Sequence, residues 1–176
     1  MKALSLKGKP IVTVASRYDN LDVYGVRCDN RGGMMAATRH LIGLGHRRIA
    51  FVGDLGNAEF EERFEGYREA LERAGIPYDD GLLYDTAGGQ AAAKAIVEAG
   101  VPVTAVAAAA DFFALQMMDV FRKAGIAMPD RIAITGFDDI GAAAKTAPAL
   151  TTVRQPIIEI GRMGLEIGRA SCRERV

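Results

Sequence analysis

Short apolar runs alternate with amphipathic segments along this chain, and the alternation restricts its fold more than any other feature. The run at residues 49–52 contains no polar side chain. Farther along, apolar side chains recur at the 4-3-4-3 spacing of a helix with one buried face. They are Phe60, Phe64, Tyr67, Leu71 and Ala74. Strands buried on both faces read as unbroken apolar runs, and alternating strand and helix patterns favour a parallel sheet. The sequence therefore predicts an α/β fold with a doubly wound parallel sheet. The expected strands cover residues 11–15, 25–28, 49–53, 82–84, 104–109 and 132–136.

Glycines and capping residues indicate where the expected helices begin and end. A glycine follows each of four periodic segments, and glycine readily adopts the left-handed conformation that ends many helices. Asp29 and Asn30 precede the first of these helices, where a side chain can accept hydrogen bonds from backbone N–H groups. Asp111 is expected to cap the fourth helix in the same way. The expected helices cover residues 34–44, 60–74, 90–99 and 113–124, and the glycines are Gly45, Gly75, Gly100 and Gly125.

Charge and cysteine content exclude several classes of protein. The 176 residues carry 22 Lys plus Arg and 22 Asp plus Glu, whereas a domain that grips DNA with its own surface usually carries a basic excess. Cys28 and Cys172 do not form a disulfide framework, which favours a reducing cytoplasm. The sequence holds no long, strongly apolar run and no secretory signal pattern at its start. We therefore expect a cytoplasmic protein with no membrane contact.

The sequence offers little for catalysis or metal binding. His40 and His46 are the only two histidines, and no Ser-His-Asp, Cys-His or zinc pattern can be assembled around them. The glycines at 43 and 45 end a helix and precede a strand, which is the reverse of a phosphate-binding turn. We therefore expect no enzyme, no cofactor and no metal site.

Polar side chains follow two of the expected core strands, at the end where parallel sheets bind ligands. Arg63 lies in the first turns of the helix after strand 49–53. Its guanidinium fork suits vicinal sugar hydroxyls or a carboxylate. The alternative is a solvated arginine beside Glu61, Glu62 and Glu65.

Asp138 and Asp139 come after the expected strand 132–136. Carboxylates in that place can accept hydrogen bonds from ligand hydroxyls. A pair of them could instead bind a divalent metal or share a catalytic proton. A third alternative is an Asx turn that closes the strand.

Two segments about a hundred residues apart carry a family resemblance. One is GHRRIAFVG at residues 45–53, and the other is GFDDI at 136–140, followed by PALTTVRQP at 148–156. In this order and at this separation they resemble the effector-binding part of LacI/GalR-type bacterial transcription repressors. The resemblance implies a two-lobed body like that of the periplasmic sugar-binding proteins, with three chain crossings between the lobes.

The same resemblance implies how the chain is divided. Residues 1–28 would be the end of the first lobe, 29–152 the essentially complete second lobe, and 153–168 the return into the first. The family's helix-turn-helix headpiece has no counterpart here, so DNA would be contacted only through that missing part, and Met1 would be an internal methionine or a false start. Residues 169–176 depart from the family pattern and are expected to be a non-native tail.

Ligand contacts are also implied by the resemblance. Arg63 and Asp138 would hold a small-molecule effector, expected to be a sugar or a sugar derivative, between the lobes. Asp139 would then form the turn. Gln155, which precedes Pro156, would touch the ligand or only hold the hinge.

Three positions depart from the family and put the sugar class in question. Ala110 stands where an asparagine reaches the ligand, Ala15 replaces a frequent aspartate, and Thr86 replaces an aromatic residue of some members. Since the chain has no Trp, Phe112, Phe137 or a first-lobe aromatic would have to supply the apolar platform for a sugar ring.

A homodimer and an allosteric mechanism complete what the resemblance implies. The effector would favour one angle about the crossovers near 28–30 and 152–155, and that angle would set the spacing of paired DNA headpieces. A ligand can shift such an equilibrium only through different affinities for the two states. The expected dimer contacts are Leu115, Met118, Asp119, Ala142 and Lys145.

Three rival functions fit the same residues. A periplasmic-type sugar-binding protein of a transport system shares the fold. An α/β enzyme could use Asp138 or Asp139. A truncated chain without most of the first lobe would bind effector weakly or not at all.

Overall fold

The chain folds as two units, joined where it leaves Asp29 for Asn30 and again where it leaves Arg154 for Gln155. The computed structural model describes residues 11–15, 23–100 and 102–173. The larger unit, Asn30–Arg154, contains the expected ligand side chains Arg63 and Asp138. The predicted lobe boundaries and the assignment of each part to a lobe stay predictions.

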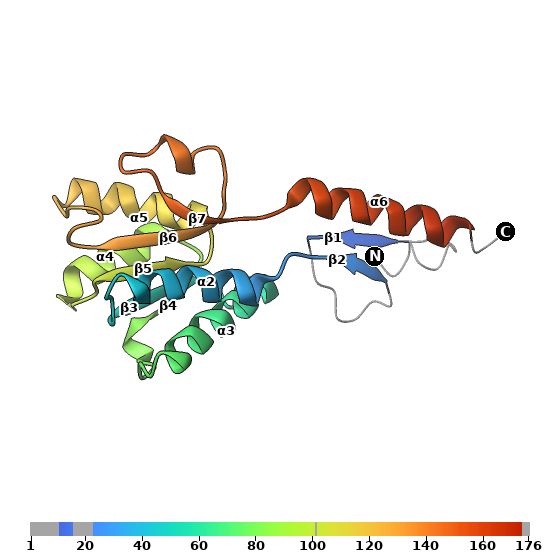
Figure 1. Cartoon of the computed structure of the whole chain (residues 1–176). Coiled ribbons are helices and arrows are strands. Elements are labelled where there is room, and N and C mark those ends of the chain that lie inside the picture. Colours follow the sequence, from blue (N-terminus) through green and yellow to red (C-terminus); the bar gives the residue numbers. More distant parts are fainter. Residues whose placement is uncertain (1–10, 16–22, 101, 174–176) are drawn as a thin grey trace. The chain divides into compact units, whose positions relative to one another are not determined.

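A five-stranded parallel sheet forms the larger unit. Its order is β4-β3-β5-β6-β7, and every pair of neighbouring strands is parallel. Helices α2 and α3 pack together, and so do α4 and α5. Figure 1 shows α2 and α3 on one side of the sheet and α5 on the other. The predicted doubly wound α/β fold is confirmed. The strands are β3 (Ile49–Gly53), β4 (Leu83–Asp85), β5 (Ala105–Ala108), β6 (Ala133–Asp138) and β7 (Thr151–Arg154), and the helices are α2 (Asn30–Gly43), α3 (Ala58–Arg73), α4 (Gly89–Ala99) and α5 (Asp111–Lys123), with 3-10 turns at Asp80–Leu82 and Ala143–Lys145.

The core of this unit lies between the sheet and its helices. All residues of β3 and β5 are buried, as expected for strands covered on both faces. Phe51 contacts the rings of Phe64 and Tyr67 at centroid distances of 5.2 and 5.4 Å. The Tyr67 hydroxyl donates to the carbonyl of Ile49 across 2.8 Å, which satisfies a polar group inside an otherwise apolar interior. Helix α3 is thereby fixed against the strand that precedes it.

Helix ends follow the sequence pattern in part. The four predicted glycines have positive φ angles, which agrees with their expected place after helices α2 to α5. Helix α3 has a cap that was not predicted from the sequence: the Asn57 side chain accepts from the N–H groups of Glu59 and Phe60. The predicted cap at Asp111 is wrong. Ala110 occupies the cap position without a side-chain hydrogen bond, and Asp111 is the first helical residue.

Strand β6 is longer than predicted. The expected end was residue 136, but the ladder continues because Phe137 pairs with Val153 and Asp138 with Arg154 on β7. Asp138 is therefore the last residue of a strand rather than part of the following loop. Its φ of 117° and the φ of 55° at Asp139 turn the chain sharply at this end of the sheet.

The smaller unit contains two strands and one helix within the described residues. Strands β1 (Val12–Val14) and β2 (Tyr24–Val26) are parallel, and helix α6 (Ile157–Arg173) packs against both. Figure 1 draws this helix in red. The helix continues into the segment predicted to be a non-native tail, of which residues 174–176 lie outside the described part. The origin of that segment stays a prediction.

Candidate ligand-binding site

Arg63 is a buried cation at the carboxyl end of the sheet. It lies in the second turn of α3, and only 2% of its surface is exposed. Its Nη1 donates to the carbonyl of Ala109 across 2.6 Å, and its Nε donates to Oδ1 of Asn30 across 2.9 Å. The alternative of a solvated arginine is therefore wrong, because the side chain turns inward over the ends of the strands.

Asp138 meets this arginine from β6. The distance from Arg63 Nη1 to Asp138 Oδ1 is 3.4 Å, although the residues are 75 positions apart in the sequence. The Asp138 side chain is 29% exposed, whereas that of Arg63 is 2% exposed. The predicted convergence of Arg63 and Asp138 is confirmed. Their contact with a ligand stays a prediction.

Two aromatic rings line the guanidinium. Its Cζ lies 3.7 Å from the centroid of the Phe137 ring and 5.3 Å from that of Phe60, distances at which a ring face attracts a cation. Phe137 is 1% exposed, and a Cβ added at Gly33 of α2 would lie 2.7 Å from its ring. The prediction that Phe137 could serve as a sugar platform is therefore wrong. Phe112 is 57% exposed and keeps that possibility.

Asp139 is bound to the neighbouring strand. Its carboxylate forms an ion pair with Arg154 of β7, and its backbone N–H donates to the Thr152 hydroxyl across 3.4 Å. A left-handed aspartate is tolerated better than most residues because its short side chain can bond locally. These contacts agree with the expected role of Asp139 in forming the turn.

Asp111 holds the loop after β6 in place. This carboxylate is completely buried and accepts from the Thr152 hydroxyl across 2.5 Å and from the Ile140 N–H across 2.9 Å. Burial raises the pKa of Asp111 above its ordinary value, and the two hydrogen bonds oppose that shift. Asp111 therefore connects α5 to both sides of the turn that carries Asp138.

The remaining predicted contacts have different surroundings. Ala110 is 6% exposed and lies at the end of the sheet, where it offers no polar side-chain atom. Gln155 is half-buried and belongs to the smaller unit, so its part in ligand binding stays a prediction.

Four of the five predicted dimer residues are at least partly exposed to solvent. Leu115 and Asp119 are half-buried on α5, while Ala142 and Lys145 are exposed on the loop between β6 and β7. Met118 is only 3% exposed, and it also lines an apolar cavity of about 180 Å³. Met118 is thus core rather than surface in this structure.

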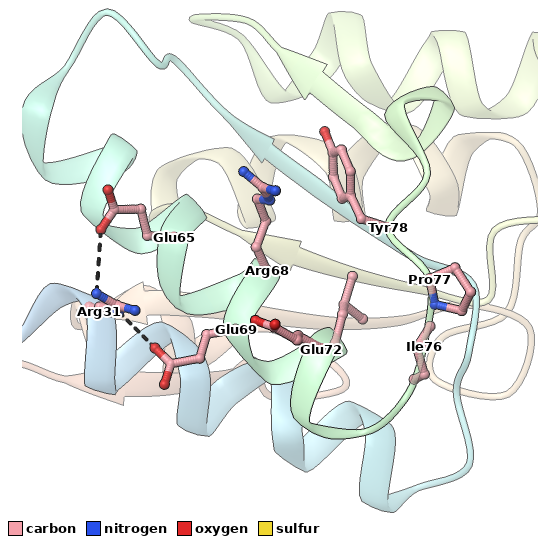
Figure 2. Close-up of a pocket in the computed structure, with 9 residues that line it drawn as sticks. Arg31, Glu65, Arg68, Glu69, Glu72, Ile76, Pro77 and Tyr78 are labelled. Carbon is pink, nitrogen blue, oxygen red and sulfur yellow. Dashed lines mark hydrogen bonds and ion pairs between the residues drawn. The ribbon is translucent and has the colours of Figure 1, made fainter.

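A further hollow lies elsewhere, on the outer side of α3. It measures about 540 Å³ and lies among charged side chains and the segment that follows α3. Figure 2 shows Arg31 reaching Glu65 and Glu69, with Arg68 and Tyr78 on the other side of the hollow. Arg31 is paired with both Glu65 and Glu69, and the Arg68 guanidinium lies over the Tyr78 ring at 5.1 Å.

The described part of the chain was also compared with the requirements for a metal site and for a membrane-spanning helix. In residues 11–15, 23–100 and 102–173, no three histidine, cysteine, aspartate or glutamate side chains are placed to hold a metal ion. In the same ranges, no helix has the length and apolar character needed to cross a membrane.

Comparison with known proteins supplies the family. Residues 38–171 match the model of the periplasmic binding protein-like domain. The HTH-type transcriptional regulator CelR of Thermobifida fusca is 36% identical over 162 residues, which are 88% of this chain and 46% of that protein. The chain thus spans about half the length of the curated relatives it matches.

Solved structures agree in fold. A LacI family transcriptional regulator from Enterococcus faecium, solved with bound ribose, has a TM-score of 0.87 and 27% identity, and the match covers 98% of this chain and 66% of that one. A complex of the transcriptional regulator CelR with cellobiose has a TM-score of 0.75 and 36% identity, covering 86% and 49%. The predicted resemblance is confirmed: the chain belongs to the periplasmic binding protein-like domain family, in the form found in LacI/GalR-type transcription regulators.

Proposed function

We propose that this chain is the effector-sensing part of a LacI/GalR-type transcriptional repressor and that Arg63 and Asp138 contact a sugar or a sugar derivative. The observation that carries this proposal is the buried cation of Arg63 against the partly exposed carboxylate of Asp138 at the carboxyl end of a parallel sheet. Ligands of open α/β sheets bind at that end.

The chemistry of the pair suits a polyhydroxylated ligand. A guanidinium donates and a carboxylate accepts, so two neighbouring hydroxyls can each find a complementary partner. Phe112 adds an exposed aromatic surface next to Asp111, on the same helix end. Two of the similar structures contain ribose and cellobiose, which makes these sugars the natural first probes.

Isothermal titration calorimetry tests the proposal. D-ribose, cellobiose and a wider panel of sugars are each titrated into the full-length protein. We expect binding of at least one sugar, and Asp138→Asn should weaken it about tenfold or more, because a neutral amide replaces the charged acceptor. Lys94→Ala on the exposed side of α4 is the matched control and should bind as the parent does. No binding by any sugar, or equal affinity in Asp138→Asn, would contradict the proposal.

The remaining parts of the regulator function are proposed in the same sense. DNA would be read through a headpiece outside this chain, because 22 basic and 22 acidic residues leave no net charge for a phosphate-binding surface. Homodimers would form through Leu115, Asp119, Ala142 and Lys145. The relatives are bacterial transcription regulators, which supports a cytoplasmic, non-enzymatic protein.

A further inference from the structure

Asn30 is the least expected polar residue of the site. It is 2% exposed, and it is the first residue of α2, directly after the point where the chain leaves the smaller unit. A side chain at that position usually caps its own helix. Here the carboxamide also reaches helix α3, more than thirty positions along the chain.

Both ends of the Asn30 carboxamide are engaged with consecutive residues of α3. Its Oδ1 accepts from Arg63 Nε across 2.9 Å, and its Nδ2 donates to Glu62 Oε2 across 3.0 Å. Only an amide offers an acceptor and a donor in this geometry. Because Glu62 fixes the donor end, the acceptor end is oriented toward Arg63.

The backbone around Asn30 is also closely packed. A Cβ added at Gly66 of α3 would overlap the carbonyl oxygen of Arg31, the residue that follows Asn30. The start of α2 and the middle of α3 therefore pack too closely for any side chain at position 66. The Asn30 carboxamide lies in this contact and has little freedom to change its position.

We propose that Asn30 is a positioning residue, which holds the Arg63 guanidinium so that its Nη1 faces Asp138 and the ligand. The inference rests on the proposed function in one respect, namely that Arg63 is a ligand contact. Since Asn30 lies at the first crossover, the same hydrogen bond ties the ligand-contacting cation to the point where the chain passes between its two units.

A first experiment needs no ligand. The Arg63 Nε–H resonance of the 176-residue chain is followed by ¹⁵N NMR, together with its rate of exchange with water. In Asn30→Ala we expect the resonance to shift and its exchange to accelerate about tenfold or more, because a buried donor loses its acceptor. An unchanged resonance and exchange rate would overturn the proposal, whatever the protein binds.

Rescue variants separate positioning from general damage. Asn30→Asp retains an acceptor for Arg63 but sets a carboxylate against Glu62, so its exchange rate should lie between those of the parent and Asn30→Ala. Glu62→Gln alone keeps an acceptor for Asn30 and should resemble the parent. The double variant Asn30→Asp with Glu62→Gln restores both hydrogen bonds: Arg63 Nε still donates to residue 30, and only the bond between residues 30 and 62 has its donor and acceptor exchanged. It should return the Arg63 resonance to its parental exchange rate. Failure of this rescue would count against the proposal.

The matched control is Glu69→Ala. Glu69 also links α2 to α3, through Arg31 Nε at 2.7 Å, but it does not contact Arg63. If Asn30 merely fastened the two helices together, Glu69→Ala would move the Arg63 resonance as much as Asn30→Ala does. We expect it to leave that resonance in place.

Ligand binding then completes the test with the sugar identified by calorimetry. Asn30→Ala should weaken binding about tenfold or more, yet in an Arg63→Ala background it should add less than about twofold, because it acts through that arginine. Additive losses in the double variant would overturn the proposal. If no sugar binds the parent protein, the proposed ligand class fails, and the NMR result still decides the role of Asn30.

Discussion

Thr152 on β7 donates its hydroxyl to Asp111 at the start of α5, across 2.5 Å, and so joins the edge strand of the sheet to the helix that covers it. The other oxygen of Asp111 accepts from Ile140 on the far side of the turn. Ile140 directly follows the turn at Asp138 and Asp139, and Thr152 lies on the neighbouring strand. The buried carboxylate of Asp111 therefore helps to position these two partly exposed aspartates.

The raised pKa of Asp111 gives a pH dependence with a definite sign. Burial raises this pKa above 3.8 in the folded chain, so the folded state holds the proton more tightly than the unfolded state does. The contribution of Asp111 to stability is therefore complete below its ordinary pKa and is lost as the pH rises through the raised pKa. Asp111→Asn cannot titrate, so the parent should lose stability relative to it as the pH rises from the ordinary carboxyl pKa through the raised pKa of Asp111. Urea unfolding at several pH values measures this difference, and parallel pH profiles would contradict it.

Gly136 should tolerate no side chain. A Cβ there would overlap Oδ1 of Asp111, so Gly136→Ala must displace a buried carboxylate. We expect a loss of about 1–3 kcal/mol in the free energy of unfolding, as for other overpacked sites. Gly43→Ala is the control, because nothing lies within 4 Å of the added Cβ, and it should be neutral or stabilising by up to about 1 kcal/mol. Equal effects of the two alanines in urea unfolding would show that the overlap is relieved at no cost.

Arg63 and Asp138 should differ in what they do for the fold. Arg63→Met leaves the carbonyl of Ala109 and the amide of Asn30 buried without their donor, at a cost of about 1–3 kcal/mol for each such group. Asp138→Asn changes a side chain that is 29% exposed, and its effect on stability should stay below about 1 kcal/mol. Thermal unfolding distinguishes the two, while both variants should lose sugar affinity. A destabilising Asp138→Asn would mean that its pair with Arg63 is structural.

The residues proposed as dimer contacts include exposed ones and one buried residue, Met118. Leu115→Asp and Lys145→Glu should shift the protein toward monomer in sedimentation velocity experiments without lowering its melting temperature. Met118→Ala should instead lower stability by about 2–5 kcal/mol, since it removes a buried side chain from a packed cavity wall. An unaltered sedimentation profile for both surface variants would place the dimer contacts elsewhere.

The fold was predictable from the sequence because its strongest signals are local. The unbroken apolar run at β3 and the glycine after each helix depend only on neighbouring residues, and both are found as expected. The meeting of Arg63 and Asp138 was predictable for a related reason, since parallel strands bring their carboxyl ends to the same edge of a sheet.

The hydrogen-bond partners of the buried polar side chains could not be predicted from the sequence. Asn30 and Asp111 both precede or begin helices, and from sequence alone each is best interpreted as a cap. Their real partners, Arg63, Glu62, Thr152 and Ile140, come from other elements and are brought near only by tertiary packing. Hydrogen bonds between polar side chains of different elements produce no periodic pattern in the sequence. The burial of Phe137 was missed for the same reason, because it depends on Arg63 covering the ring.

The inward position of Arg63 has a thermodynamic consequence for recognition. An arginine on an open surface must be desolvated each time a ligand binds. Arg63 is instead desolvated when the protein folds, and Asn30 and Ala109 then hold it by hydrogen bonds. Preorganisation of this kind lowers the ordering cost of each association event. If Arg63 contacts the ligand as we propose, selectivity would depend on whether that ligand matches the geometry of a fixed cation.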